Sequence, residues 1–102
     1  MKSLKEYSEK RKLEGENHEA EILYNFGRVF AHCNINSLSI FYFEKSIKLC
    51  ELIILSKSQE ISTLEFYKDL LSKSAMNLLS IYDNTNEIMK AMEILNKYLV
   101  VD

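Results

Sequence analysis

Apolar residues recur every three or four positions through most of the chain, the spacing expected of helices with one buried side. The spacing predicts four such helices, separated by short polar segments. Their apolar positions are Ile22, Leu23, Phe26, Val29, Phe30 and Cys33; Ile40, Phe43, Ile47, Cys50 and Ile54; Leu64, Leu71, Ala75, Leu78, Leu79 and Tyr82; and Ile88, Ala91, Met92, Leu95, Tyr98 and Leu99. Residues 1–16 are polar and predict a further short helix or an arm. With no Pro and only two Gly, the chain is expected to be all-α, with about five helices.

Polar residues between these stretches indicate where the helices begin and end. Asn17 is placed to cap one helix, Asn36 or Ser37 the next, and Ser62 with Glu65 has the spacing of a capping box. Residues 83–86 are expected to form a turn. Because the links are short, consecutive helices should run antiparallel.

Two segments of the chain repeat the same pattern at an offset of 52 residues, as from Asn25 to Asn77. The first set is Asn25, Gly27, Phe30, Ser39, Phe43 and Ser46, and the second is Asn77, Leu79, Tyr82, Ala91, Leu95 and Tyr98. The first set follows the order of small and large residues found in tetratricopeptide repeats, and the second relaxes it, with Leu79 and Tyr98 where small residues are usual. Such repeats usually span about 34 residues. We therefore expect two tetratricopeptide-like antiparallel helix pairs with extended helices, forming a short α-solenoid; a generic four- or five-helix bundle is the alternative.

The repeat predicts three segments and a packing role for each repeated residue. Residues 1–16 would be the polar helix or arm, 17–58 the first pair with an extended second helix, and 59–102 the second pair, acting as a C-terminal cap. The residues expected to pack the helices of each pair together are Gly27, Phe30, Ser39, Phe43 and Ser46, then Leu79, Tyr82, Ala91 and Leu95. Gly27 would allow close approach, whereas Leu79 replaces it in the second pair.

The charge and the cysteine content limit the kinds of ligand that the chain is expected to bind. The net charge of −2 does not suggest phosphate binding, and the cluster Lys10, Arg11 and Lys12 is surrounded by glutamates, so we interpret it as a solvated helix face. Cys33 and Cys50 lie in apolar helical patterns without metal-ligand or C-x-x-C spacing, which predicts reduced core thiols in an intracellular protein. We expect no metal, no cofactor, no membrane span and no small-molecule substrate.

The first helix of each pair would line a concave face of the array. Its predicted partner-binding residues are Tyr24, Asn25, Arg28 and His32, then Lys73, Asn77, Ser80 and Asn84. An asparagine amide could bond to a partner's backbone or pair within the array. A carboxylate clamp of the kind used by chaperone-binding repeats would have only Arg28 and Lys73 as cations.

A second candidate surface comes from successive aromatics in the second predicted helix. Phe41 and Tyr42 lie beside Phe43, and three consecutive side chains cannot all face one side of a helix. At least one is expected to meet a partner, or to be covered by the helix carrying Leu4 and Tyr7. No nucleophile, phosphate-loop or metalloprotease motif is present, so an enzyme is not expected.

Residues 22–32 (ILYNFGRVFAH) and 37–45 (SLSIFYFEK), followed after a longer insert by 74–82 (SAMNLLSIY), resemble the last repeats of the tetratricopeptide subunit of transcription factor IIIC. The resemblance implies a nuclear scaffold that helps to assemble the RNA polymerase III machinery on transfer RNA genes. Its partners would be other subunits of transcription factors IIIC and IIIB, and other subunits would make the sequence-specific DNA contacts. The alternatives are a general tetratricopeptide adaptor or co-chaperone in another complex, or a small helical enzyme or ligand carrier.

Overall fold

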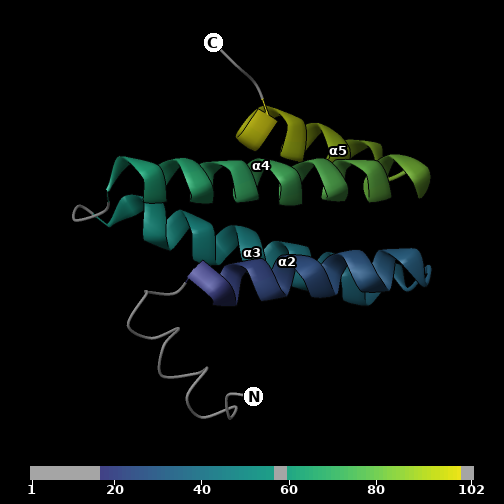
Figure 1. Ribbon diagram of the computed structural model, residues 1–102. Helices are drawn as coiled ribbons and strands as arrows, with labels where there is room; N and C mark the ends of the chain where they lie inside the picture. Colours follow the sequence, from purple (N-terminus) through teal and green to yellow (C-terminus); the bar gives the residue numbers. More distant parts are fainter. Residues whose placement is uncertain (1–16, 57–59, 100–102) are drawn as a thin grey trace, which may run out of the picture.

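The computed structural model describes residues 17–56 and 60–99 of the 102-residue chain (Figure 1). The described elements are α2 (Asn17–His32), α3 (Asn36–Leu55), α4 (Ile61–Asn84), α5 (Ile88–Ile94) and the π-helical turn η1 (Leu95–Leu99). The predicted all-α fold is confirmed: four helices pack together, and the described residues contain no strand. The arm predicted at residues 1–16 lies outside the described residues.

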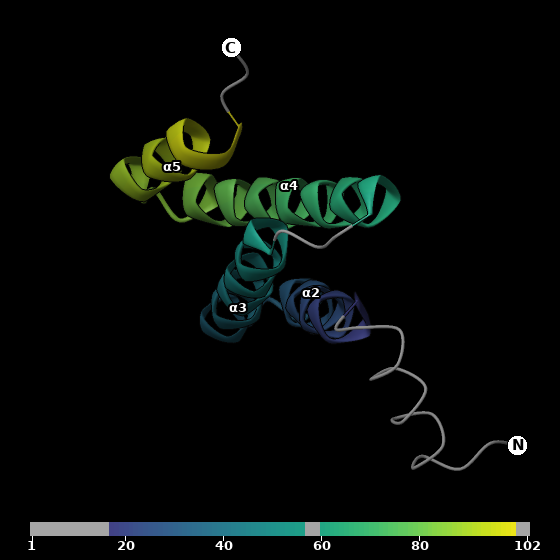
Figure 2. The ribbon, with the colours of Figure 1, turned by 90° about the vertical axis from the view of Figure 1, so that its left-hand side faces the viewer.

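The helices form two layers, one of α2 and α3 and the other of α4 and α5 (Figures 1 and 2). Each helix runs opposite to the one before it, because the links between them are short. As a result α2 and α4 run in the same direction, and α3 packs against both of them.

The turns after α2 and α4 have the same hydrogen-bonded geometry at positions 52 residues apart. Asn34 and Asn86 both have φ = 61°. The backbone N–H of the next residue donates to a carbonyl five positions back in each turn, from Ile35 to Phe30 at 2.9 Å and from Glu87 to Tyr82 at 2.8 Å. This is the Schellman arrangement, in which asparagine is one of the few residues other than glycine that tolerates the left-handed conformation.

Side-chain capping is where the sequence prediction was wrong. α3 begins after Ile35 and α4 after Glu60, and neither residue makes a side-chain cap hydrogen bond. Asn36 and Ser62 lie within their helices, because each helix begins earlier than the capping pattern suggested. α4 also continues through Asn84, so the turn is confined to Thr85 and Asn86.

The core has two apolar clusters. The larger joins α3, α4 and α5 through Phe43, Ile47, Ala75, Leu78, Ile81, Tyr82 and Ala91. The smaller joins the beginning of α2 to α3 and α4 through Ala20, Cys50, Ile53, Tyr67 and Leu70. The α3–α4 interface therefore runs through both clusters and holds the two layers together.

α2 and α3 cross closely at small residues. A Cβ atom added to Gly27 would lie only 2.7 Å from Cδ1 of Phe43, whose side chain is fully buried. The hydroxyl of Ser39 donates to the carbonyl oxygen of Gly27 at 2.7 Å, and that of Ser46 to the carbonyl oxygen of Ala20 at 2.9 Å. The Ser74 hydroxyl reaches Ser46 Oγ at 3.4 Å and extends these contacts to α4.

The second pair packs differently at the equivalent positions. Ala91 and Tyr82 are buried and Leu79 is partly buried, but Leu95 is 42% exposed. Tyr98, which stands where the first pair has Ser46, is partly buried and donates from its hydroxyl to Glu51 Oε1 at 3.4 Å. The π-helical turn spans this part of the chain.

Cys50 is a free, buried thiol, as the sequence predicted, whereas Cys33 is free but exposed. The prediction for Cys33 was wrong because α2 ends at His32, which leaves Cys33 in the turn. The pKa of Cys50 is raised to about 11, mainly because the thiol is buried. The hydrogen bond with Ser46 lowers this pKa, and the nearby charge of Glu51 raises it, both by smaller amounts.

Candidate protein-binding cleft

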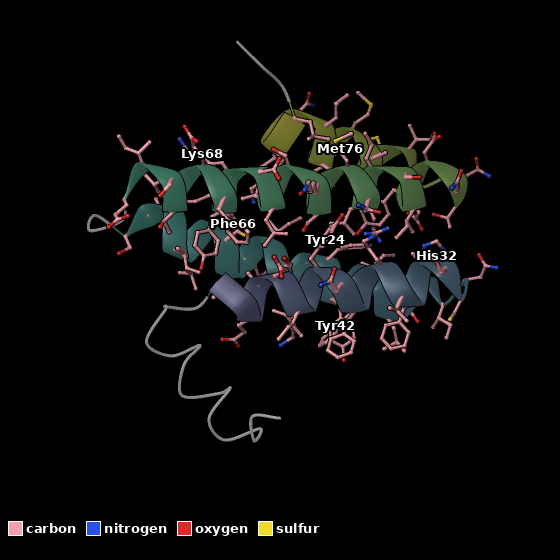
Figure 3. The ribbon with its side chains drawn as sticks, in the orientation of Figure 1. Tyr24, His32, Tyr42, Phe66, Lys68 and Met76 are labelled. Carbon is pink, nitrogen blue, oxygen red and sulfur yellow. The ribbon has the colours of Figure 1, made fainter. Side chains whose placement is uncertain are left out.

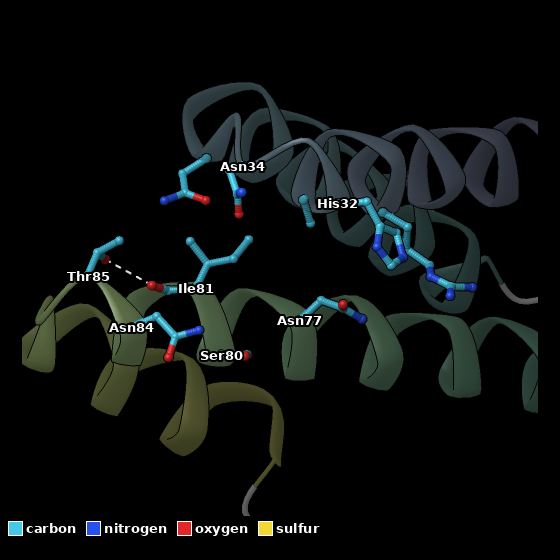
Figure 4. A pocket seen from close by; sticks show the side chains of 10 residues that line it. His32, Asn34, Asn77, Ser80, Ile81, Asn84 and Thr85 are labelled. Atoms are coloured by element: carbon cyan, nitrogen blue, oxygen red, sulfur yellow. Dashed lines mark hydrogen bonds between the residues drawn. The ribbon is translucent and has the colours of Figure 1, made fainter.

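A cleft of about 420 Å³ lies between the C-terminal ends of α2 and α4 (Figure 4). Both ends meet on the same side of the molecule because the two helices run in the same direction. The cleft is lined by Arg28, Ala31, His32, Asn34, Asn36, Asn77, Ser80, Ile81, Asn84 and Thr85.

Asparagine side chains are the dominant polar groups of the cleft. Asn34 and Asn36 come from the turn after α2 and the start of α3, while Asn77 and Asn84 come from α4. A primary amide has two N–H donors and a carbonyl acceptor, so each can pair with both kinds of polar group. One amide is already partly engaged: Asn77 Nδ2 donates to the carbonyl oxygen of Lys73 at 2.8 Å.

The end of the cleft is fixed by the turn after α4. The Thr85 hydroxyl donates to the carbonyl oxygen of Ile81 at 2.9 Å, which satisfies a carbonyl group of the last helical turn (Figure 4). Ile81 and Ala31 add apolar surface between the polar groups. The lining is thus mainly hydrogen-bonding, with two apolar side chains among the polar ones.

The ionisable groups that line the cleft are basic. Arg28 places its guanidinium carbon 5.9 Å from the ring centre of Tyr24, a cation–π contact, and His32 follows one turn later on α2. None of the described residues that line the cleft is a carboxylate. Arg28 therefore adds a positive charge to the lining that no described lining carboxylate neutralises.

The structure brings five of the eight predicted partner-binding residues together in this cleft, namely Arg28, His32, Asn77, Ser80 and Asn84. The other three do not line it. Tyr24 is partly buried with its ring 5.8 Å from that of Phe43, and Asn25 is exposed elsewhere on α2. Lys73 forms an ion pair with Asp69 at 3.0 Å, and the hydrogen bond and charge of Asp69 raise the pKa of Lys73.

Sequence reasoning missed five lining residues, namely Ala31, Asn34, Asn36, Ile81 and Thr85. Most of them lie at or beside the two Schellman turns. The available signal was the direction of the helices: alternate helices run parallel, so their C-terminal turns gather at one end of the molecule.

The second candidate surface is an aromatic cluster on the side of the first layer that faces away from α4 (Figure 3). Tyr42 stacks on Phe30 with ring centres 5.5 Å apart and planes inclined by 11°, and it also contacts Phe26 at 5.3 Å. Phe41 meets the edge of Tyr42 at 5.2 Å and carries Lys45 Nζ 5.0 Å above its ring, yet it stays exposed. The possible cover by the helix of Leu4 and Tyr7 lies outside the described residues.

In comparisons with known proteins, no family model matches the chain, and no curated protein or solved structure gives a significant match. Among residues 17–56 and 60–99, no helix has both the length and the apolar content required to cross a membrane. The same part of the chain contains no group of three or more His, Cys, Asp and Glu side chains arranged to hold a metal ion.

Proposed function

We propose that the chain is a protein-interaction scaffold, in which two tetratricopeptide-like helix pairs present the cleft between α2 and α4 to an extended segment of a partner protein. The observation that carries this proposal is the amide-rich lining. Four asparagines line one cleft together with Arg28 and His32, and no described lining residue carries a negative charge.

The chemistry of the cleft matches that of an extended backbone. Each residue of an extended peptide offers one N–H donor and one carbonyl acceptor, which an asparagine amide can pair with simultaneously. A volume of about 420 Å³ falls within the range of pockets that hold small ligands and is suited to a few peptide residues rather than to a folded surface. The apolar side chains of Ala31 and Ile81 would contact the partner's side chains.

We assign the scaffold to transcription factor IIIC on the basis of the resemblance of residues 22–45 and 74–82 to the last repeats of its tetratricopeptide subunit. The near-neutral charge of the chain agrees with a subunit that contacts proteins while others contact DNA. On this proposal the protein is nuclear, and its partners are subunits of transcription factors IIIC and IIIB.

The proposal is tested by a tagged pull-down from the native cell, with partners identified by mass spectrometry. Recovery of transcription factor IIIC or IIIB subunits is the expected result. Recovery of chaperones, or of an unrelated assembly without these subunits, would overturn the assignment.

Two variants test the role of the cleft in the same experiment. Asn77→Ala removes an amide that lines the cleft, whereas Asn25→Ala removes the amide at the equivalent position of α2, which does not line it. Loss of partners with Asn77→Ala and retention with Asn25→Ala is expected, with both proteins remaining helical by circular dichroism. Equal recovery with both variants would contradict the role of the cleft.

A further inference from the structure

The two ends of the helix array carry apolar side chains that are exposed or half-buried. At one end, an aromatic end face is formed by Phe26, Val29, Phe30, Phe41 and Tyr42 on α2 and α3. At the other end, a methionine end face is formed by Met76, Met92, Leu95 and Leu99 on α4, α5 and η1. Tyr42 and Met76 mark these opposite sides of the molecule in Figure 3.

The 52-residue repeat relates the aromatic end face to a surface that is buried inside the molecule. Leu78, Ile81 and Tyr82 of the second pair are covered by the first pair, in one cluster with Phe43 and Ile47. Their counterparts 52 residues earlier are the three α2 members of the aromatic end face, Phe26, Val29 and Phe30. Phe26 is 47% exposed where Leu78 is fully buried, so the aromatic end face lacks the cover that its counterpart has.

The methionine end face corresponds in the same way to the first pair's side of the contact between the layers. Phe43 and Ile47 of the first pair, with the partly buried Tyr24 and Ile40, belong to the cluster that packs against the second pair. The residues 52 positions later are Leu95, Leu99, Met76 and Met92, which are the four members of the methionine end face. Each end of the molecule therefore reproduces one side of the contact that joins its two layers.

We propose that the occupant of each end face is a second copy of this chain, added head to tail so that the aromatic end face of one molecule covers the methionine end face of the next. Two features favour this occupant. The contact repeats the interface already present between the layers, and flexible thioether side chains pack favourably against aromatic rings.

The geometry of such a contact predicts its behaviour in solution. The two surfaces are different, so an open assembly of any length keeps one free face of each kind at its two ends. Association therefore does not stop at a dimer unless the rotation closes a ring. The inference is separate from the proposed function, because the residues that line the cleft belong to neither end face.

The test uses the full chain in sedimentation velocity over a series of protein concentrations, where the average mass should rise with concentration. Phe26→Glu places a charge in the aromatic end face, and Met92→Glu places one in the methionine end face. Each variant alone should be monomeric. Mixed in equal amounts they should form a dimer and nothing larger, because the pair retains one intact face of each kind.

A matched control is Ile61→Glu, which replaces an apolar side chain that is 77% exposed at the start of α4, about 22 Å along the helix from Met76. It should associate like the unaltered protein. If circular dichroism shows that Phe26→Glu is unfolded, Phe41→Glu takes its place, because Phe41 is exposed on the same face.

Two outcomes would overturn the inference. In the first, the unaltered chain remains monomeric at every concentration. That result would indicate that an end face is covered by residues 1–16 or serves a different protein. Alternatively, one variant could retain a dimer while the other loses it, with no dimer gained on mixing, which would indicate contact between two identical faces instead.

Discussion

The two helix pairs of this protein have turns of the same geometry, but their helices approach each other to different extents. Asn34 and Asn86 adopt the same left-handed conformation, with the same backbone hydrogen bonds around them. At the crossing points, the first pair has Gly27 and two buried serines, whereas the second has Leu79, Ala91 and Tyr98. The comparison teaches that reversal of the chain depends on the turn residue, while close packing depends on small side chains several residues away.

The second helices of the two pairs also differ in burial, because α3 packs against both α2 and α4, whereas α5 packs mainly against α4. α3 buries six residues along its length, whereas α5 buries Ala91, and η1 buries none of its residues. A large side chain at position 98 stands where Ser46 allows α3 to lie against the backbone of α2. α5 and η1 are therefore expected to contribute less to stability than α3.

Replacement of equivalent residues in the two pairs should give the largest difference. Phe43→Ala empties a fully buried position and should lower the free energy of unfolding by about 3–5 kcal/mol. Leu95→Ala alters a side chain that is already 42% exposed and should cost less than about 1 kcal/mol. Urea denaturation at low protein concentration measures both, and equal losses would remove the distinction between the pairs.

Gly27→Leu gives the first pair the residue that the second pair has at the equivalent position, Leu79. Because even a Cβ atom would lie 2.7 Å from the buried Phe43 ring, the ring or the helices must shift, at a cost of about 1–3 kcal/mol. The matched change Leu79→Met nearly conserves the side-chain volume, so it should lower the free energy of unfolding by less than about 1.5 kcal/mol. Thermal denaturation followed by circular dichroism checks both, and an unchanged midpoint for Gly27→Leu would contradict the close crossing.

Alkaline pH should weaken the packing of α3 around Cys50, a fully buried residue of the first pair. The thiol of Cys50 has a pKa of about 11 in the folded chain against an ordinary value of 9.0, so it ionises more readily once unfolded. Its contribution to stability is complete below pH 9 and declines between about pH 9 and 11, by roughly 1–3 kcal/mol.

The measurement is the free energy of unfolding against pH for the unaltered protein and for Cys50→Ala. Burial also raises the pKa of Tyr82, but this group is present in both proteins and largely cancels in the difference. A difference between the two proteins that stays constant from pH 8 to 11 would show that the thiol is not responsible.

The smallest effect should be the same in both pairs. Asn34→Ala and Asn86→Ala each place a Cβ-bearing residue without a polar side chain at φ = 61°, which should cost about 1 kcal/mol. Asn34→Gly and Asn86→Gly should lack this penalty. Chemical denaturation of the four variants measures these costs. A large loss of stability at only one of the two turns would show that the turns are not equivalent.

Much of the fold could be predicted from the sequence because helical periodicity and the repeat are local patterns. The order of the helices follows from the apolar spacing, and the turn after α4 follows from the polar residues at 83–86. The ends of the helices could not be predicted as well. The Ser62–Glu65 spacing suggested a capping box, yet α4 begins at Ile61, so Ser62 lies inside the first turn and Glu60 stands at the cap position without a side-chain hydrogen bond.

The cleft could be predicted in part. The repeat pointed to residues of α2 and α4, and five of these line the cleft, but the contribution of Asn34 and Thr85 depends on how the turns lie in space. Lys73 does not line the cleft, and its ammonium group pairs with Asp69 on the same helix.

The buried serines have a consequence for the longitudinal register of the helices. Apolar surfaces alone resist sliding weakly, because a side chain that leaves one apolar neighbour meets another a short distance along the helix. The hydroxyls of Ser39 and Ser46 hold α2 at two points along its axis, and a shift by one residue, about 1.5 Å, would break both hydrogen bonds. Through Ser74 the same hydrogen bonds reach α4, the other wall of the cleft. A ligand would therefore meet walls whose spacing is set before it arrives, and little of its binding free energy would be spent on ordering them.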